Sequence, residues 1–264
     1  MTELQIAAES GLCAELNGRI LAEKKSTELL ATGQLDKFVI LYESLAAIRS
    51  HDLAFNAPII VSDAAHSFSE KDPSAKIKLS TGELLSVKQA IEILMILSDK
   101  TAAFLLINTV FGNDHNWRCE TSHFFEQLKI KDDFFTVSDQ NDDDQLIQDS
   151  HMTARSLLKI LNKLFNDFPE MLELAKQPEL VFQSDRQAIK IKNPNVFLND
   201  ADLVTISIAN SAKEDDLVAF FKMNQKQYLL ELLGLESSQL RDRDTRYTQT
   251  KELFSQVRDQ LWQK

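Results

Sequence analysis

The sequence predicts a mixed α/β (α+β) fold, in which both chain ends form one antiparallel sheet and a helical layer is inserted between them. A hairpin signal near the start, long apolar segments without Gly or Pro in the middle, and strand-like segments after residue 180 support this class. An antiparallel sheet that collects both ends satisfies this order of elements. We expect a single domain over residues 1–264, with a sheet part at about 10–30 and 180–264 and a helical part at about 37–175.

The strand signals of the first third are short. Residues 12–24 indicate a hairpin, because two strand-like segments flank the Asn-Gly pair at 17–18, the strongest short-range hairpin signal. Residues 58–62 (PIIVS) and 76–79 (KIKL) also have the composition of short strands.

Apolar segments of helical length fill the middle of the chain. Residues 37–49 (KFVILYESLAAIR) are dense in apolar residues and predict a mostly buried helix. Ser86 is expected to be the N-cap of an apolar helix that continues to residue 97. Further helices are predicted at residues 101–111, 120–129 and about 153–166, with a shorter one after Phe168-Pro169-Glu170.

The last third of the chain is dominated by strand-like rather than helical segments. Four segments predict strands that join the opening hairpin in one sheet, at residues 180–182, 188–191, 203–208 and 217–221. A helix is expected at about 225–233, and another at about 248–262 closes the chain.

Composition excludes several classes of protein. Hydrophobic residues make up 44% and charged residues 26%, as in ordinary globular proteins. The net charge of −11 argues against nucleic acid and against an anionic membrane surface, since both require clustered Lys and Arg. No run approaches 18 apolar residues, so no transmembrane segment is expected. The start (MTEL) lacks a signal-peptide pattern, so the protein either stays in the cytoplasm or has had a leader removed.

Cysteines, histidines and acidic residues give no clear metal or cofactor site. Cys13 and Cys119 are too few for a disulfide framework, although a single bridge between them stays open. His115, Cys119 and His123 are spaced four apart, but such positions drift around a helix and converge poorly on a metal ion. Asp139 and residues 142–144 lack the Gly and Glu of an EF-hand, which favours a solvated acidic loop.

Six fragments in order resemble the serine-type D-Ala-D-Ala carboxypeptidases, the low-molecular-mass penicillin-binding proteins of the peptidase S11 group. They are NGRILAEK at 17–24, LLSVKQ at 84–89, TARSL at 153–157, NDFPE at 166–170, KNP at 192–194 and the closing helix. The resemblance runs from about residue 10 to the C-terminus and implies a β-lactamase/transpeptidase-like fold. It also implies a serine acyl-transfer site made of three short motifs.

The first two motifs are altered. At the family's S-x-x-K, in which the lysine activates the serine nucleophile, this chain has Gln34-Leu35-Asp36-Lys37. The lysine is kept, but a carboxamide cannot form an acyl-enzyme. At the family's S-x-N stands Ser98-Asp99-Lys100, in which Lys replaces Asn. This second cation is expected near Lys37, where two ammonium groups would lower each other's pKa.

The third motif, K-T/S-G on an edge strand, is missing, because no glycine occurs between Gly112 and Gly234. The resemblance therefore implies a pseudoenzyme without cofactor or metal, with Lys37 and Ser98 as catalytic remnants. It would act as a binding or regulatory module for a peptidoglycan-type peptide or a protein partner. Two alternatives remain open: an active serine hydrolase that uses Ser98 and Lys37, and a protein in which only the fold survives.

Overall fold

The computed structural model describes residues 2–31, 35–72, 75–131, 151–194, 203–210, 214–236, 251–252, 254–259 and 261. Gln34 and the predicted acidic loop at 132–149 lie outside the described residues. The described part of the predicted closing helix is helical.

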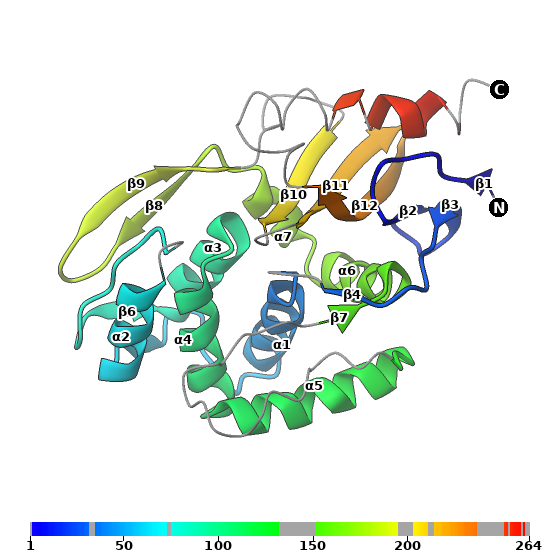
Figure 1. Cartoon of the computed structure of the whole chain (residues 1–264). Coiled ribbons are helices and arrows are strands. Elements are labelled where there is room, and N and C mark those ends of the chain that lie inside the picture. The colour runs from blue at the N-terminus through cyan, green and yellow to red at the C-terminus, as the bar shows by residue number, and fades with distance from the viewer. Residues whose placement is uncertain are drawn as a thin grey trace.

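The main sheet collects strands from both chain ends, as predicted (Figure 1). Its order is β1-β3-β2-β12-β11-β10, and every neighbouring pair is antiparallel except β1 and β3. β2 and β3 form the predicted hairpin, in which Gly18 supplies the positive φ of 90° that the turn requires. The strands are β1 (Thr2–Glu3), β2 (Ser10–Glu15), β3 (Ile20–Lys24), β10 (Leu203–Asn210), β11 (Glu214–Met223) and β12 (Lys226–Glu236).

Three small antiparallel pairs lie outside the main sheet: β4 (Leu30–Ala31) with β7 (His151–Met152), β5 (Pro58–Ile60) with β6 (Leu84–Ser86), and β8 (Glu179–Gln183) with β9 (Ala188–Lys192). The strands at 180–182 and 188–191 are confirmed, but the prediction that they join the main sheet is wrong. The predicted strand at 76–79 is also wrong. Its apolar residues Ile77 and Leu79 are buried, but the Leu79 N–H donates to the Ser69 hydroxyl rather than to a strand.

Seven of the described helices lie on one face of the main sheet, with α1 at the centre of this helical layer, and the closing helix lies on the other face (Figure 1). The seven are α1 (Lys37–Arg49), α2 (Asp63–Lys71), α3 (Val87–Leu97), α4 (Lys100–Phe111), α5 (Asp114–Leu128), α6 (Ala154–Asp167) and α7 (Glu170–Ala175). α5 begins six residues before its predicted start, because the Asn113 side chain accepts from the Asn116 N–H and caps it there. None of the described helices is long and apolar enough to cross a membrane.

Residues 226–233, predicted as part of a helix at about 225–233, belong to β12. Asn224 and Gln225, both with positive φ, make the two-residue turn between β11 and β12. Leu229 and Leu233 face the core under the helices, whereas Leu230 and Leu232 face a second core that includes Val257. A strand covered on both faces has a continuous apolar sequence, so its periodicity does not separate it from a buried helix.

Candidate functional site

The junction of α1, α3 and α4 holds Lys37 from the first predicted motif and Ser98-Asp99-Lys100 from the second. Lys37 is the first residue of α1, and its side chain is only 2% exposed. Its amine donates to the Ser98 hydroxyl at 2.8 Å and to the Met95 carbonyl at 3.3 Å. Lys37 and Ser98 are 61 positions apart in the sequence, and the fold brings their side chains into direct contact.

The short break between α3 and α4 sets the position of the Ser98 hydroxyl. α3 begins at a capping box, in which Ser86 accepts from the Gln89 N–H and the Gln89 side chain accepts from the Ser86 N–H. It ends at Ser98, which has left-handed backbone angles (φ 52°, ψ 40°). Asp99 then caps α4 by accepting from the N–H groups of Thr101 and Ala102. Ser98 therefore lies at a sharp corner and stays partly exposed beside the buried amine.

Burial controls the electrostatics of this junction. Removal from water lowers the pKa of the Lys37 amine to about 7, against a smaller opposite effect of Asp36. Burial likewise raises the pKa of Asp36 to about 7, although Lys100 and Lys37 act to lower it. The sequence predicted a lowered pKa for Lys37 through Lys100; the pKa is lowered, but the cause is burial, and the charge of Lys100 acts on Asp36. A lysine with a pKa near neutrality is chemically able to take a proton from an adjacent hydroxyl.

The described part of this junction includes neither the nucleophile position nor the third motif of the predicted site. Gln34, at the nucleophile position three residues before Lys37, lies outside the described residues. β10 is one of the two edge strands of the main sheet, at the end opposite β1, and its sequence LVTISIAN contains neither lysine nor glycine. β10 therefore lacks the K-T/S-G pattern, the third motif of the resembled family.

A cavity of about 710 Å³ lies at the other end of α1, between α1, the end of α4 and α5. Sequence reasoning missed its main polar residue, Glu43, which is only 8% exposed. The Glu43 carboxyl accepts from the Trp117 indole N–H at 2.9 Å and from the Thr121 hydroxyl at 3.0 Å. Burial raises the pKa of Glu43 to about 8, opposed by the hydrogen bonds from Thr121 and Trp117 and reinforced by Glu120. The available signal was an acidic residue within the apolar helical segment 37–49.

The cysteine and histidine positions do not make a metal site in the described part of the chain. His115, Cys119 and His123 lie along α5, with the Cys119 Sγ 4.0 Å from the His115 Nε2. Among the described residues, no group of three His, Cys, Asp or Glu side chains is placed to hold a metal ion. Cys13 is buried and Cys119 is exposed, and both are free thiols, so the disulfide left open by the sequence does not form.

Comparison with known proteins identifies the family. The family model of the D-alanyl-D-alanine carboxypeptidases, Peptidase S11, matches residues 1–227. Because this match covers most of the chain, the protein belongs to the D-alanyl-D-alanine carboxypeptidase family, as the sequence fragments predicted. This family acts on peptidoglycan peptides. No curated protein sequence matches the chain.

Solved penicillin-binding proteins share the fold over almost the whole chain. A peptidoglycan synthesis regulatory factor (PBP3) from Streptococcus pneumoniae has a TM-score of 0.81 at 17% identity, over 96% of this chain and 80% of that one. Penicillin-binding protein 5 from Haemophilus influenzae has a TM-score of 0.80 at 19% identity, over 96% of this chain and 71% of that one. Penicillin-binding protein D2 from Listeria monocytogenes, bound to cefotaxime, has a TM-score of 0.76 at 18% identity, over 97% and 99%. These likenesses confirm the transpeptidase-like fold.

Proposed function

We propose that this protein is a non-catalytic member of the carboxypeptidase family that binds peptidoglycan-type peptides or regulates their processing. The observation that carries the proposal is the residue at the nucleophile position, Gln34, three positions before Lys37 in the sequence. A carboxamide forms no acyl-enzyme. The lysine that would activate a serine there has its amine buried and hydrogen-bonded to Ser98 and to the Met95 carbonyl.

The edge strand supports the same conclusion. In the family, the third motif binds the substrate carboxylate and its backbone contributes to the oxyanion hole. β10 contains no lysine and no glycine. Removal of a single oxyanion donor costs about 10²–10³-fold in rate in a serine hydrolase. The ancestral reaction would therefore be lost even if a nucleophile were present.

A labelling experiment tests the absence of catalysis. The wild-type protein is treated with a fluorescent penicillin, its intact mass is measured, and release of D-Ala from a D-Ala-D-Ala peptide is followed beside an active carboxypeptidase. We expect no adduct and no D-Ala. Gln34→Ser alone should also stay inactive, because the carboxylate site and oxyanion hole are still missing. Turnover by Gln34→Ser, or a penicilloyl adduct on the wild type, contradicts the proposal.

A binding experiment tests whether the protein binds peptidoglycan-type peptides. Lys100 stands at the family's Asn position and is partly exposed, so its charge is available to a peptide carboxylate. Calorimetric titration with N-acetyl-L-Lys-D-Ala-D-Ala should show binding that Lys100→Gln weakens about tenfold, or about 1.4 kcal/mol. Lys88→Gln is the matched control, because Lys88 lies on α3, where it pairs with Glu92. Absence of binding, or equal loss in both variants, argues against a peptide-binding module.

One observation favours a second candidate, an active hydrolase that uses Ser98 and Lys37. The Ser98 hydroxyl is partly exposed and lies 2.8 Å from an amine whose pKa is lowered to about 7 by burial. Such an enzyme would label at Ser98, faster as the pH rises through about 7 and Lys37 becomes neutral. The labelling would disappear in Ser98→Ala and in Lys37→Met.

A further inference from the structure

The cavity at the far end of α1 is separate from the junction of Lys37 and Ser98. Its lining residues on α1 that lie nearest to Lys37 are Tyr42 and Glu43, five and six positions further on, about 8–9 Å along the helix axis. Its volume of about 710 Å³ falls within the range of small-molecule sites, which is about 300–1,000 Å³. The carboxypeptidase-type motifs contribute none of its lining residues.

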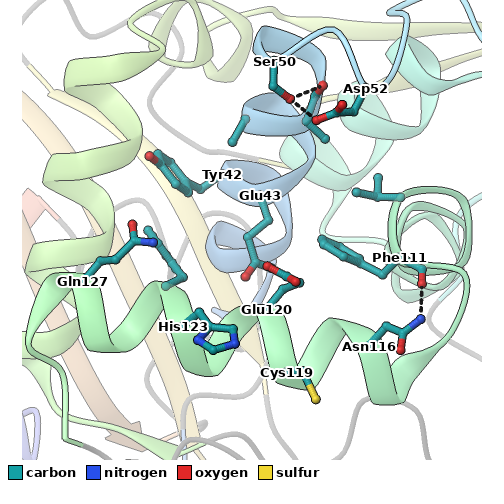
Figure 2. Close-up of a pocket in the computed structure, with 14 residues that line it drawn as sticks. Tyr42, Glu43, Ser50, Asp52, Phe111, Asn116, Cys119, Glu120, His123 and Gln127 are labelled. Carbon is teal, nitrogen blue, oxygen red and sulfur yellow. Dashed lines mark hydrogen bonds between the residues drawn. The ribbon is translucent and has the colours of Figure 1, made fainter.

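The described lining of the cavity contains three acidic residues and neither lysine nor arginine, although His123 also lines it. The acidic residues are Glu43, Glu120 and Asp52. Figure 2 shows Glu43 extending from α1 toward α5, where the side chain of Glu120 lies beside it. Lys163 lies over the Tyr42 ring, but its amine is bound to Asp167 at 2.8 Å.

The buried carboxyl is oriented before any ligand arrives. The Trp117 indole and the Thr121 hydroxyl both donate to Glu43 and hold it at the cavity wall. Burial and the neighbouring Glu120 raise its pKa to about 8, so the empty cavity favours the neutral acid. A cation between Glu43 and Glu120 would reverse this, because an opposite charge at close range favours the ionised carboxylate.

Five of the lining residues form an apolar part that suits a hydrocarbon group. Ala46, Ala47 and Val110 provide aliphatic surface, and Phe111 and Phe124 provide aromatic surface. Small-molecule sites commonly combine such apolar walls with a few oriented polar groups. Aromatic rings also attract cations, through the negative charge on their faces.

We propose that this cavity binds a small organic amine, with its ammonium group between Glu43 and Glu120 and its hydrocarbon body against the apolar side chains. The ligand class follows from the paired acids, the lack of lysine and arginine in the lining, and the aliphatic and aromatic walls. This site is independent of peptide binding at the Lys37 junction.

The test uses three probes that share a phenyl ring and two methylene groups: phenethylammonium, 2-phenylethanol and 3-phenylpropionate. The readout is the NMR signal of the Trp117 indole N–H, which donates directly to Glu43. Phenethylammonium should shift this signal saturably, with a Kd of about 1 mM or below. 2-Phenylethanol should bind at least tenfold more weakly, and 3-phenylpropionate should not bind.

Glu120→Gln is the decisive variant, because Glu120 is exposed on α5 and its replacement leaves the core intact. It should weaken phenethylammonium binding about five- to tenfold. Glu170→Gln is the control, since Glu170 is an exposed acidic residue on α7 and does not line the cavity. A response to 3-phenylpropionate equal to that of the amine, no saturable shift, or unchanged affinity in Glu120→Gln would each overturn the proposal.

Discussion

The buried carboxyl of Glu43 predicts a specific dependence of stability on pH. Its pKa is raised from 4.5 to about 8, chiefly by burial, so the folded protein holds a proton that the unfolded chain releases at neutral pH. The stabilisation that the protonated Glu43 carboxyl gives the fold is fully present below pH 4.5 and is lost as the pH rises to about 8. The difference between the two pKa values, 4.5 and about 8, corresponds to about 5 kcal/mol of unfolding free energy, at about 1.36 kcal/mol per pH unit.

Glu43→Gln removes this titration while keeping the size and neutrality of the protonated acid. The Gln side-chain oxygen can still accept from the Trp117 indole and the Thr121 hydroxyl, the two donors that contact Glu43. The stability of the variant relative to wild type should therefore rise by about 4 kcal/mol between pH 5 and pH 9. Subtracting the wild-type curve cancels the other titrating groups.

Urea unfolding at pH 5, 6, 7, 8 and 9, followed by tryptophan fluorescence and circular dichroism, measures this difference. Glu126→Gln serves as the control and should give a profile parallel to wild type, because its carboxyl is exposed. Parallel profiles for Glu43→Gln and wild type would refute the reasoning. Such parallel profiles would mean that the donors from Trp117 and Thr121 outweigh burial and keep Glu43 ionised throughout this pH range.

Three further substitutions test the fold. Ser86→Ala removes the capping box of α3 and should cost about 1 kcal/mol of unfolding free energy in urea; an unchanged midpoint would argue against the cap. Phe38→Ala empties a fully buried position on α1 and should cost about 3–5 kcal/mol, so a loss below 1 kcal/mol would contradict its place in the core. Arg155→Lys breaks the two-pronged contact with Glu23 and should cost about 0.5–1 kcal/mol, which Arg155→Gln should match or exceed.

Local signals in the sequence predicted many of the elements and the family. The Asn-Gly pair predicted the opening hairpin, and the apolar segment 37–49 coincides with α1. Ser86 was predicted as a helix cap and forms a capping box. These features depend on contacts between residues a few positions apart, which composition and spacing can reveal. The altered motifs at Gln34 and Lys100, and the stretch without glycine from 113 to 233, are also properties of the sequence alone.

Three features depend on long-range contacts and burial, and only the tertiary structure decided them: the strand β12, the side-chain contacts at the two sites and the shifted pKa values. Residues 226–233 form a strand that is covered on both faces, and periodicity alone does not distinguish such a strand from a buried helix. The contact between Lys37 and Ser98 spans 61 positions, and that between Glu43 and Trp117 spans 74. The low pKa of Lys37 and the high pKa of Glu43 both follow chiefly from removal of the side chain from water. That desolvation arises only when distant helices pack together, because a charged group in the extended chain remains hydrated.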